Sequence, residues 1–93
     1  MYAIICFDRP ASSALRDANR EAHMAHLEAN VEKIIFAGPL KDEEGVASTG
    51  AVFILDADNR EDAESFSNGD AFNTAGVYES VIIRPFRKVF PAE

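Results

Sequence analysis

The 93-residue sequence has a single cysteine, few basic residues and no long apolar run. One cysteine cannot form an internal disulfide, which is typical of reducing compartments and predicts a cytoplasmic location. Nine Lys and Arg against 16 Asp and Glu give a formal charge of −7, which argues against nucleic acid or an anionic membrane surface as the main partner. No stretch approaches the ~18 apolar residues that a membrane span needs. The first eight residues also lack the basic leader of a secretory signal.

The composition itself is that of a folded chain, with 47% hydrophobic and 27% charged residues. This length predicts one domain over residues 1–93. By general surface scaling, a chain of 10.2 kDa buries roughly 64% of its unfolded surface, which is enough for one modest core. A second subunit would therefore add useful buried area.

Alternating β-rich and helix-forming segments predict the element order βαββαβ. We expect strands over 2–7, 31–37, 51–55 and 77–90, and helices over 13–30 and 60–66. Gly38-Pro39 predicts a turn directly after the second strand, and Pro85 predicts an edge, a bulge or a bend in the last one. Residues 70–76 form either a helical turn or an irregular loop. This order is the ferredoxin-like α+β arrangement, an antiparallel sheet with both helices on one face.

The predicted strands carry apolar side chains on both of their faces, as the pairs Ile4-Ile5 and Ile34-Ile35 show. An antiparallel sheet covered on one side only usually has a polar outer face. Two helices supply one cover, so the second apolar face needs another partner. The simplest partner is a second copy of the chain, and we expect a homodimer packed sheet to sheet.

The first predicted helix separates into two faces at about 100° per residue. Alanines gather on one face, and the other face holds Arg16, Arg20, His23, Met24 and Leu27. An imidazole among bulky apolar side chains needs a partner, because burying it unpaired is costly. His23 is therefore either a satisfied core histidine, with Arg20 reaching solvent, or a functional group. His26 points about 60° away from His23, and no third strong ligand is present, so no metal site is expected.

Two further side chains have both a structural and a chemical interpretation. Asp70 follows Asn68-Gly69, where an aspartate commonly caps a short turn. A carboxylate can also accept an imidazole N–H and orient the ring. Cys6 lies inside an apolar strand and is expected to be a small core residue rather than a nucleophile.

An ordered set of short motifs resembles the YciI-like (YCII-related) family across essentially the whole chain. The motifs are Arg20-Glu21-Ala22-His23, Ala37-Gly38-Pro39-Leu40, Gly50-Ala51, Asp70-Ala71-Phe72, Ala75-Gly76-Val77-Tyr78-Glu79 and Arg84-Pro85-Phe86. The resemblance implies a dimeric α+β barrel and a histidine–aspartate dyad, which here would be His23 and Asp70. This chain has Ala71 where the family often has proline, and Ala51 where the family often has serine.

The resemblance also implies a class of chemistry, a cofactor-independent lyase or isomerase reaction on a small cyclic or aromatic compound. The expected substrate-binding residues are Arg20, which would hold an anionic oxygen, together with Gly38, Pro39 and Phe72. The expected partners are a small-molecule substrate and a second copy of the chain, as a homodimer or a higher oligomer. Two alternatives stay open: a non-catalytic dimeric protein that binds a small molecule, and a relative of the haem- or oxygen-using monooxygenases.

Overall fold

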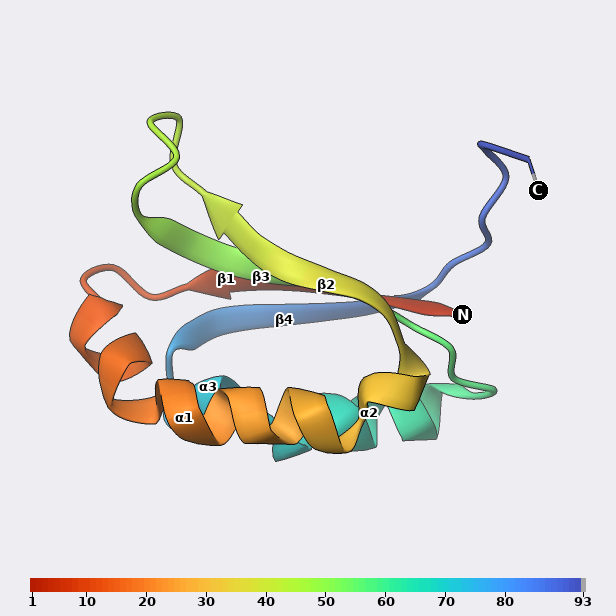
Figure 1. Cartoon of the computed structure of the whole chain (residues 1–93), viewed down its shortest axis with the longest axis horizontal. Helices are drawn as coiled ribbons and strands as arrows, with labels where there is room; N and C mark the ends of the chain where they lie inside the picture. Colours follow the sequence, from red (N-terminus) through yellow and green to blue (C-terminus); the bar gives the residue numbers. More distant parts are fainter. Residues whose placement is uncertain (93) are drawn as a thin grey trace.

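The computed structural model describes residues 1–92 and contains one four-stranded antiparallel sheet with helices on one of its faces (Figure 1). The strands are β1 (Tyr2–Asp8), β2 (Ile34–Lys41), β3 (Ser48–Leu55) and β4 (Tyr78–Pro85), in the spatial order β2-β3-β1-β4. The helices are α1 (Ser13–Ala29), α2 (Arg60–Gly69) and the short α3 (Ala71–Thr74). The predicted ferredoxin-like α+β fold is confirmed, with α3 as one added helical turn. Among the helices of residues 1–92, none combines the length and apolar composition needed to cross a bilayer.

The core lies between the sheet and the helices, because alternate residues of each strand point toward α1 and α2. Ile4 and Cys6 of β1 face the helices beside Phe53 and Leu55 of β3, and all four side chains are buried. Phe66 of α2 closes this core with an edge-on contact to Phe53. Cys6 is therefore a core residue, as the sequence predicted.

The opposite face of the sheet carries apolar side chains and, within residues 1–92, no helix covers it (Figure 1). Ile5 of β1 pairs with Val52 of β3 and Ile82 of β4, which places all three side chains on this face. Phe7 and Phe36 lie on the same face and are 45% and 59% exposed. The sheet is thus apolar on both sides, and only one side has a cover in the single chain.

The prediction of a turn at Gly38-Pro39 was wrong, because β2 runs through both residues. Gly38 pairs with Val52 and Pro39 pairs with Ala51 of β3. Proline is tolerated there because β2 is an edge strand, where one side of the backbone needs no hydrogen-bonding partner. The reversal comes later, at residues 42–47, where the Asp42 carboxylate accepts hydrogen bonds from the backbone of Val46 and Ala47.

The predicted ends of several elements also differ from the structure. The expected strand over 31–37 begins with a 3₁₀ turn, Val31–Lys33, so the strand itself starts at Ile34. The last strand ends at Pro85 rather than near residue 90, because Pro85 pairs with Tyr2, where β1 begins, and residues 86–92 form no further strand. Helix α2 extends to Gly69 rather than ending at residue 66, and Asn59 caps its start by accepting a hydrogen bond from Asp62 N.

Candidate functional site

A cavity of about 290 Å³ lies between the inner face of α1 and the sheet. The bulky face of α1 predicted from the sequence forms one wall, with Arg16, Arg20, His23, Met24 and Leu27. Edge strand β2 contributes Gly38 and Pro39, and Phe72 of α3 contributes an aromatic wall. Five of the six residues that the sequence analysis singled out therefore line one cavity, and the sixth, Asp70, lies behind His23.

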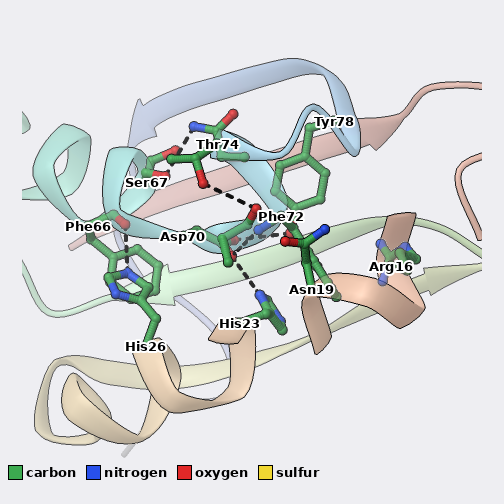
Figure 2. A network of polar contacts seen from close by, with 12 residues as sticks. Arg16, Asn19, His23, His26, Phe66, Ser67, Asp70, Phe72, Thr74 and Tyr78 are labelled. Carbon is green, nitrogen blue, oxygen red and sulfur yellow. Dashed lines mark hydrogen bonds and ion pairs between the residues drawn. The ribbon is translucent and has the colours of Figure 1, made fainter. Parts of the chain in front are cut away.

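His23 and Asp70 come from distant parts of the chain and meet at this cavity (Figure 2). His23 Nδ1 lies 2.6 Å from Asp70 Oδ1. The same carboxylate accepts a hydrogen bond from the Phe72 backbone N–H at 3.0 Å and, at Oδ2, from the Tyr78 hydroxyl at 3.2 Å. The Asp70 carboxylate is buried, and an ionised carboxylate can only accept hydrogen bonds. His23 therefore carries a hydrogen on Nδ1 and donates a hydrogen bond through it to Asp70.

The second nitrogen of His23, Nε2, is open to the cavity. Within residues 1–92 it has no hydrogen-bonding partner, and no buried side-chain nitrogen or oxygen of these residues lacks one, so Nε2 is accessible. The imidazole stacks on Phe72 with ring centroids 3.8 Å apart and planes 7° from parallel. The ring is therefore held by Asp70 and Phe72, with Nε2 as the atom able to exchange a proton with a bound molecule.

Local sequence explains how Asp70 reaches this place. Helix α2 ends at Gly69, and Asp70 is the N-cap of α3, because its side chain accepts the hydrogen bond from Phe72 N. The interpretation of Asp70 as a turn cap is confirmed, and the imidazole contact is present as well. Ala71, where the family often has proline, still allows a cap with regular geometry, so the carboxylate is fixed by its hydrogen bonds.

Arg16 is the cavity residue whose importance the sequence analysis did not recognise. Its guanidinium makes two hydrogen bonds to Asp8, at 2.7 and 3.0 Å, and one to Gly50 O at 3.0 Å. It also lies 4.8 Å from the centre of the Phe72 ring. Burial acts to lower the pKa of Arg16, but the hydrogen bonds and charge of Asp8 outweigh it and the pKa is raised. The available signal was its position two helical turns before His23 on the same face.

Arg20, the arginine that the sequence analysis did select, has a different environment. Its side chain is 59% exposed and forms an ion pair with Asp17 at 3.1 Å. Such an exposed pair contributes little to stability. Arg20 borders the cavity but is not fixed by buried partners.

Two buried weak acids, Tyr78 in the cavity lining and Cys6 in the core, stay protonated at neutral pH. Burial raises the pKa of Tyr78 far above its ordinary value of 10.0, and the charge of Asp70 raises it further. The phenol is therefore a hydrogen-bond donor to Asp70. Burial likewise raises the pKa of Cys6 to about 12, with Asp70 and Asp8 adding to the shift, so this thiol is not a nucleophile at neutral pH.

His26, the other histidine of α1, lies outside the cavity. Its Nε2 is 2.8 Å from Phe66 O, so it donates to a backbone carbonyl of α2. In the part of the chain that the structure describes, no three His, Cys, Asp or Glu side chains come together as metal ligands.

An open sheet with a cavity beneath it, and a helix-borne histidine paired with a buried aspartate, defines a small ferredoxin-like protein with a ligand-sized site. The family model of the YCII-related domain matches residues 1–87 of the sequence, and the chain belongs to this family.

Relatives match over nearly their whole length. Protein YciI of Escherichia coli O6:H1 is 33% identical, with 97% of this chain and 99% of the relative covered. An uncharacterized protein of Haemophilus influenzae is 34% identical, with 96% and 98% covered. Among solved structures, 5-chloro-2-hydroxyhydroquinone dehydrochlorinase (TftG) from Burkholderia phenoliruptrix AC1100, in complex with 2,5-dihydroxybenzoquinone, superposes with a TM-score of 0.82. That protein is 30% identical, and the match covers 94% of each chain.

Proposed function

We propose that this protein is a cofactor-independent enzyme of the lyase or isomerase type that moves a proton on a small cyclic or aromatic compound. The observation that carries the proposal is the polarised imidazole: Nδ1 is bonded to buried Asp70 while Nε2 is open to a cavity. The similarity to a dehydrochlorinase supports the lyase class.

In this mechanism His23 is the general base and Asp70 orients it. Nε2 takes a proton from the substrate, and the electron pair left behind forms a new double bond in the ring compound. In a lyase reaction this pair expels a leaving group such as chloride, whereas in an isomerase reaction His23 returns the proton to another atom. Asp70 stabilises the imidazolium that forms, and a positioned base of this kind contributes typically ~10²- to 10⁴-fold in rate.

The remaining predicted site residues would hold the ring. Phe72 offers an aromatic face, Gly38 and Pro39 form the wall on β2, and the exposed Arg20 at the border would attract an anionic ligand toward the cavity. The cavity volume of about 290 Å³ lies at the lower end of the range for ligand pockets, roughly 300 Å³ and above. A single substituted ring suits this size, and the ligand named with the similar dehydrochlorinase is such a ring.

The test is a panel of hydroxylated and chlorinated ring compounds incubated with the protein in D₂O. The panel includes 5-chloro-2-hydroxyhydroquinone and 2,5-dihydroxybenzoquinone. NMR would follow exchange of ring hydrogens, and a chloride electrode would follow elimination. We expect at least one compound to react, and His23→Gln to lower the initial rate about 100-fold or more. Equal rates for the wild-type protein and His23→Gln over the whole panel would overturn the proposal.

The alternative function, a non-catalytic protein that binds a small molecule, uses the same cavity. It is favoured if a panel compound raises the melting temperature in a saturable way, since a ligand of the folded state stabilises it, but shows neither exchange nor elimination. The two functions are thus separated by turnover, measured on the same compounds.

We further propose that the protein acts as a homodimer in the cytoplasm. The uncovered apolar sheet face, with Ile5, Val52 and Ile82 at its centre, supports the dimer. Cys6 is a buried free thiol, which suits a reducing compartment. Sedimentation equilibrium at micromolar concentration would test the assembly: we expect a dimer, and a shift toward monomer for Val52→Lys. A wild-type monomer would contradict the proposal, and a larger assembly would point to a further interface.

A further inference from the structure

We propose that Arg16, rather than Arg20, is the residue that receives an anionic oxygen of the bound ring compound, and that it makes the cavity selective for ionised ligands. The inference rests on the proposed function, since it concerns the same cavity. It extends that function by naming the charge state of the ligand and the residue that selects it.

A count of donors shows what Arg16 has left to offer. A guanidinium has five N–H donors. Nε donates to Asp8 Oδ2, and the two hydrogens of Nη2 are used by Asp8 Oδ1 and Gly50 O. Nη1, with its two hydrogens, has no partner within residues 1–92, and no unpartnered side-chain nitrogen of these residues is buried. Because Arg16 lines the cavity, Nη1 is its accessible donor group.

These contacts also immobilise Arg16 before any ligand arrives. Its side chain is 8% exposed and that of Asp8 is 5% exposed, and Ser12 adds a hydroxyl hydrogen bond to Asp8. A preorganised donor loses little conformational entropy on binding, whereas an exposed and flexible side chain such as Arg20 loses more. The difference favours Arg16 as the group that discriminates among ligands.

The charges around the cavity point to the same ligand class. The protein has a formal charge of −7, yet no Asp or Glu is among the described residues that line the cavity, which include two arginines and His23. The nearby carboxylates are already satisfied, Asp8 by Arg16 and Asp70 by His23, Tyr78 and the Phe72 amide. An anion in the cavity thus meets donors, and no carboxylate faces it.

Arg16 and His23 are placed so that one ring compound reaches both. Each contacts Phe72, with the guanidinium carbon 4.8 Å and the imidazole centre 3.8 Å from the centre of its ring. The guanidinium carbon and the imidazole centre are therefore separated by no more than the sum of these two distances, and both groups border the same cavity. When His23 removes a proton, the negative charge that develops on a ring oxygen would be stabilised at Arg16 Nη1.

The experiment compares an acidic ring compound with a neutral one by calorimetric titration. The probes are 2,5-dihydroxybenzoquinone, which is ionised at neutral pH, and hydroquinone, which is not. We expect the wild-type protein to bind the ionised compound at least 10-fold more tightly, and Arg16→Met to lose most of that preference, because a charge-assisted hydrogen bond contributes about 10- to 100-fold. The matched control is Arg87→Met, which removes an exposed arginine outside the cavity and should keep the full preference.

Arg16→Met leaves Asp8 buried without its partner and could fail to fold. The double variant Asp8→Asn/Arg16→Met removes this orphan charge. In the wild-type protein the visible spectrum of bound 2,5-dihydroxybenzoquinone, followed during acidification, gives an independent measurement. Arg16 should keep the bound compound ionised at lower pH than the free compound. Equal affinity of the wild-type protein for both probes, an unshifted spectrum, or a folded Arg16 variant that retains the preference would each overturn the inference.

His23→Gln separates this inference from the proposed function. It should retain the preference for the ionised probe while losing proton transfer. If proton transfer proves independent of His23 but the preference still depends on Arg16, the catalytic proposal fails and the present inference stands.

Discussion

The two histidines of α1 lie three residues apart and have opposite environments (Figure 2). His23 donates through Nδ1 to the Asp70 carboxylate and leaves Nε2 open to the cavity. His26 donates through Nε2 to the Phe66 carbonyl, and its Nδ1 lies 3.4 Å from the Asn30 amide nitrogen. Both nitrogens of His26 have partners, whereas His23 Nε2 has none among the residues that the structure describes.

The comparison shows that the partner, and not the residue type, determines what a histidine can do. A carboxylate favours the imidazolium that a general base becomes after taking a proton. The backbone carbonyl that pairs with His26 carries no net charge. The hydrogen bond from His26 Nε2 to this carbonyl instead holds α1 and α2 together. His23 is therefore suited to proton transfer and His26 to fixing α1 against α2.

The largest expected effect is on activity, and it separates the two histidines directly. With a substrate from the ring-compound panel, His23→Gln should lower kcat/KM about 10²- to 10⁴-fold, because the base is lost. His26→Gln should leave kcat/KM within about 2-fold while lowering the free energy of unfolding by about 1 kcal/mol. Steady-state kinetics and urea unfolding of both variants check this pair. Equal losses of activity would remove the distinction.

The second prediction concerns the carboxylate that distinguishes the two environments. Asp70→Asn places an amide where three donors converge, so at least one buried donor loses its acceptor. We expect a loss of about 2–3 kcal/mol in unfolding free energy. Asp58→Asn, at an exposed position, is the control and should change stability by less than about 0.5 kcal/mol. An unchanged urea midpoint for Asp70→Asn would argue against a buried, ionised acceptor.

The third prediction sharpens the structural role of His26. A Cβ at Gly69 would lie 2.7 Å from His26 Cε1, so Gly69→Ala must displace the ring from its bond to Phe66. We expect a destabilisation of about 1 kcal/mol with unchanged activity. The double variant His26→Ala/Gly69→Ala has no such clash. Adding Gly69→Ala to His26→Ala should therefore lower the free energy of unfolding much less than Gly69→Ala does alone. Additive costs of the two substitutions would show that the ring and the glycine do not interact.

The smallest expected effect is seen at alkaline pH. The pKa of Tyr78 is raised in the folded protein, so the unfolded chain releases this proton first, near its ordinary pKa of 10.0. Stability contributed by the protonated phenol is complete below that pH and is lost as the pH rises above it. Between pH 9 and 11 the wild-type protein should lose about 1 kcal/mol more unfolding free energy than Tyr78→Phe. Cys6 titrates in both proteins and cancels in the difference. Parallel pH profiles would contradict this account.

Much of the fold was predictable, because periodicity is a local property of the chain. The sequence separated an alanine face of the first helix from a face with bulky, arginine and histidine side chains, and the second of these faces lines the cavity. The prediction of a turn at Gly38-Pro39 was wrong, because the sequence alone does not show that β2 is an edge strand, where proline is tolerated. The last strand was extended too far because its end depends on where β1 begins.

The site was predictable only in part, because its contacts join distant segments. Asp70 could be recognised as a cap from its neighbours, but its distance to His23 depends on how α3 packs against α1. Arg16 was on the correct face, yet nothing local distinguished it from Arg20. The difference between them comes from Asp8 and Gly50, which only the folded sheet brings within reach.

The shared oxygen of Asp70 makes the backbone of α3 a natural reporter of the imidazole. Oδ1 receives both His23 Nδ1 and the Phe72 amide hydrogen. When the ring gains a second proton, electron density at that oxygen moves toward the imidazolium and the amide hydrogen bond weakens. The Phe72 amide resonance should therefore shift when His23 takes a second proton from a bound compound, which gives a label-free signal of proton transfer in the cavity.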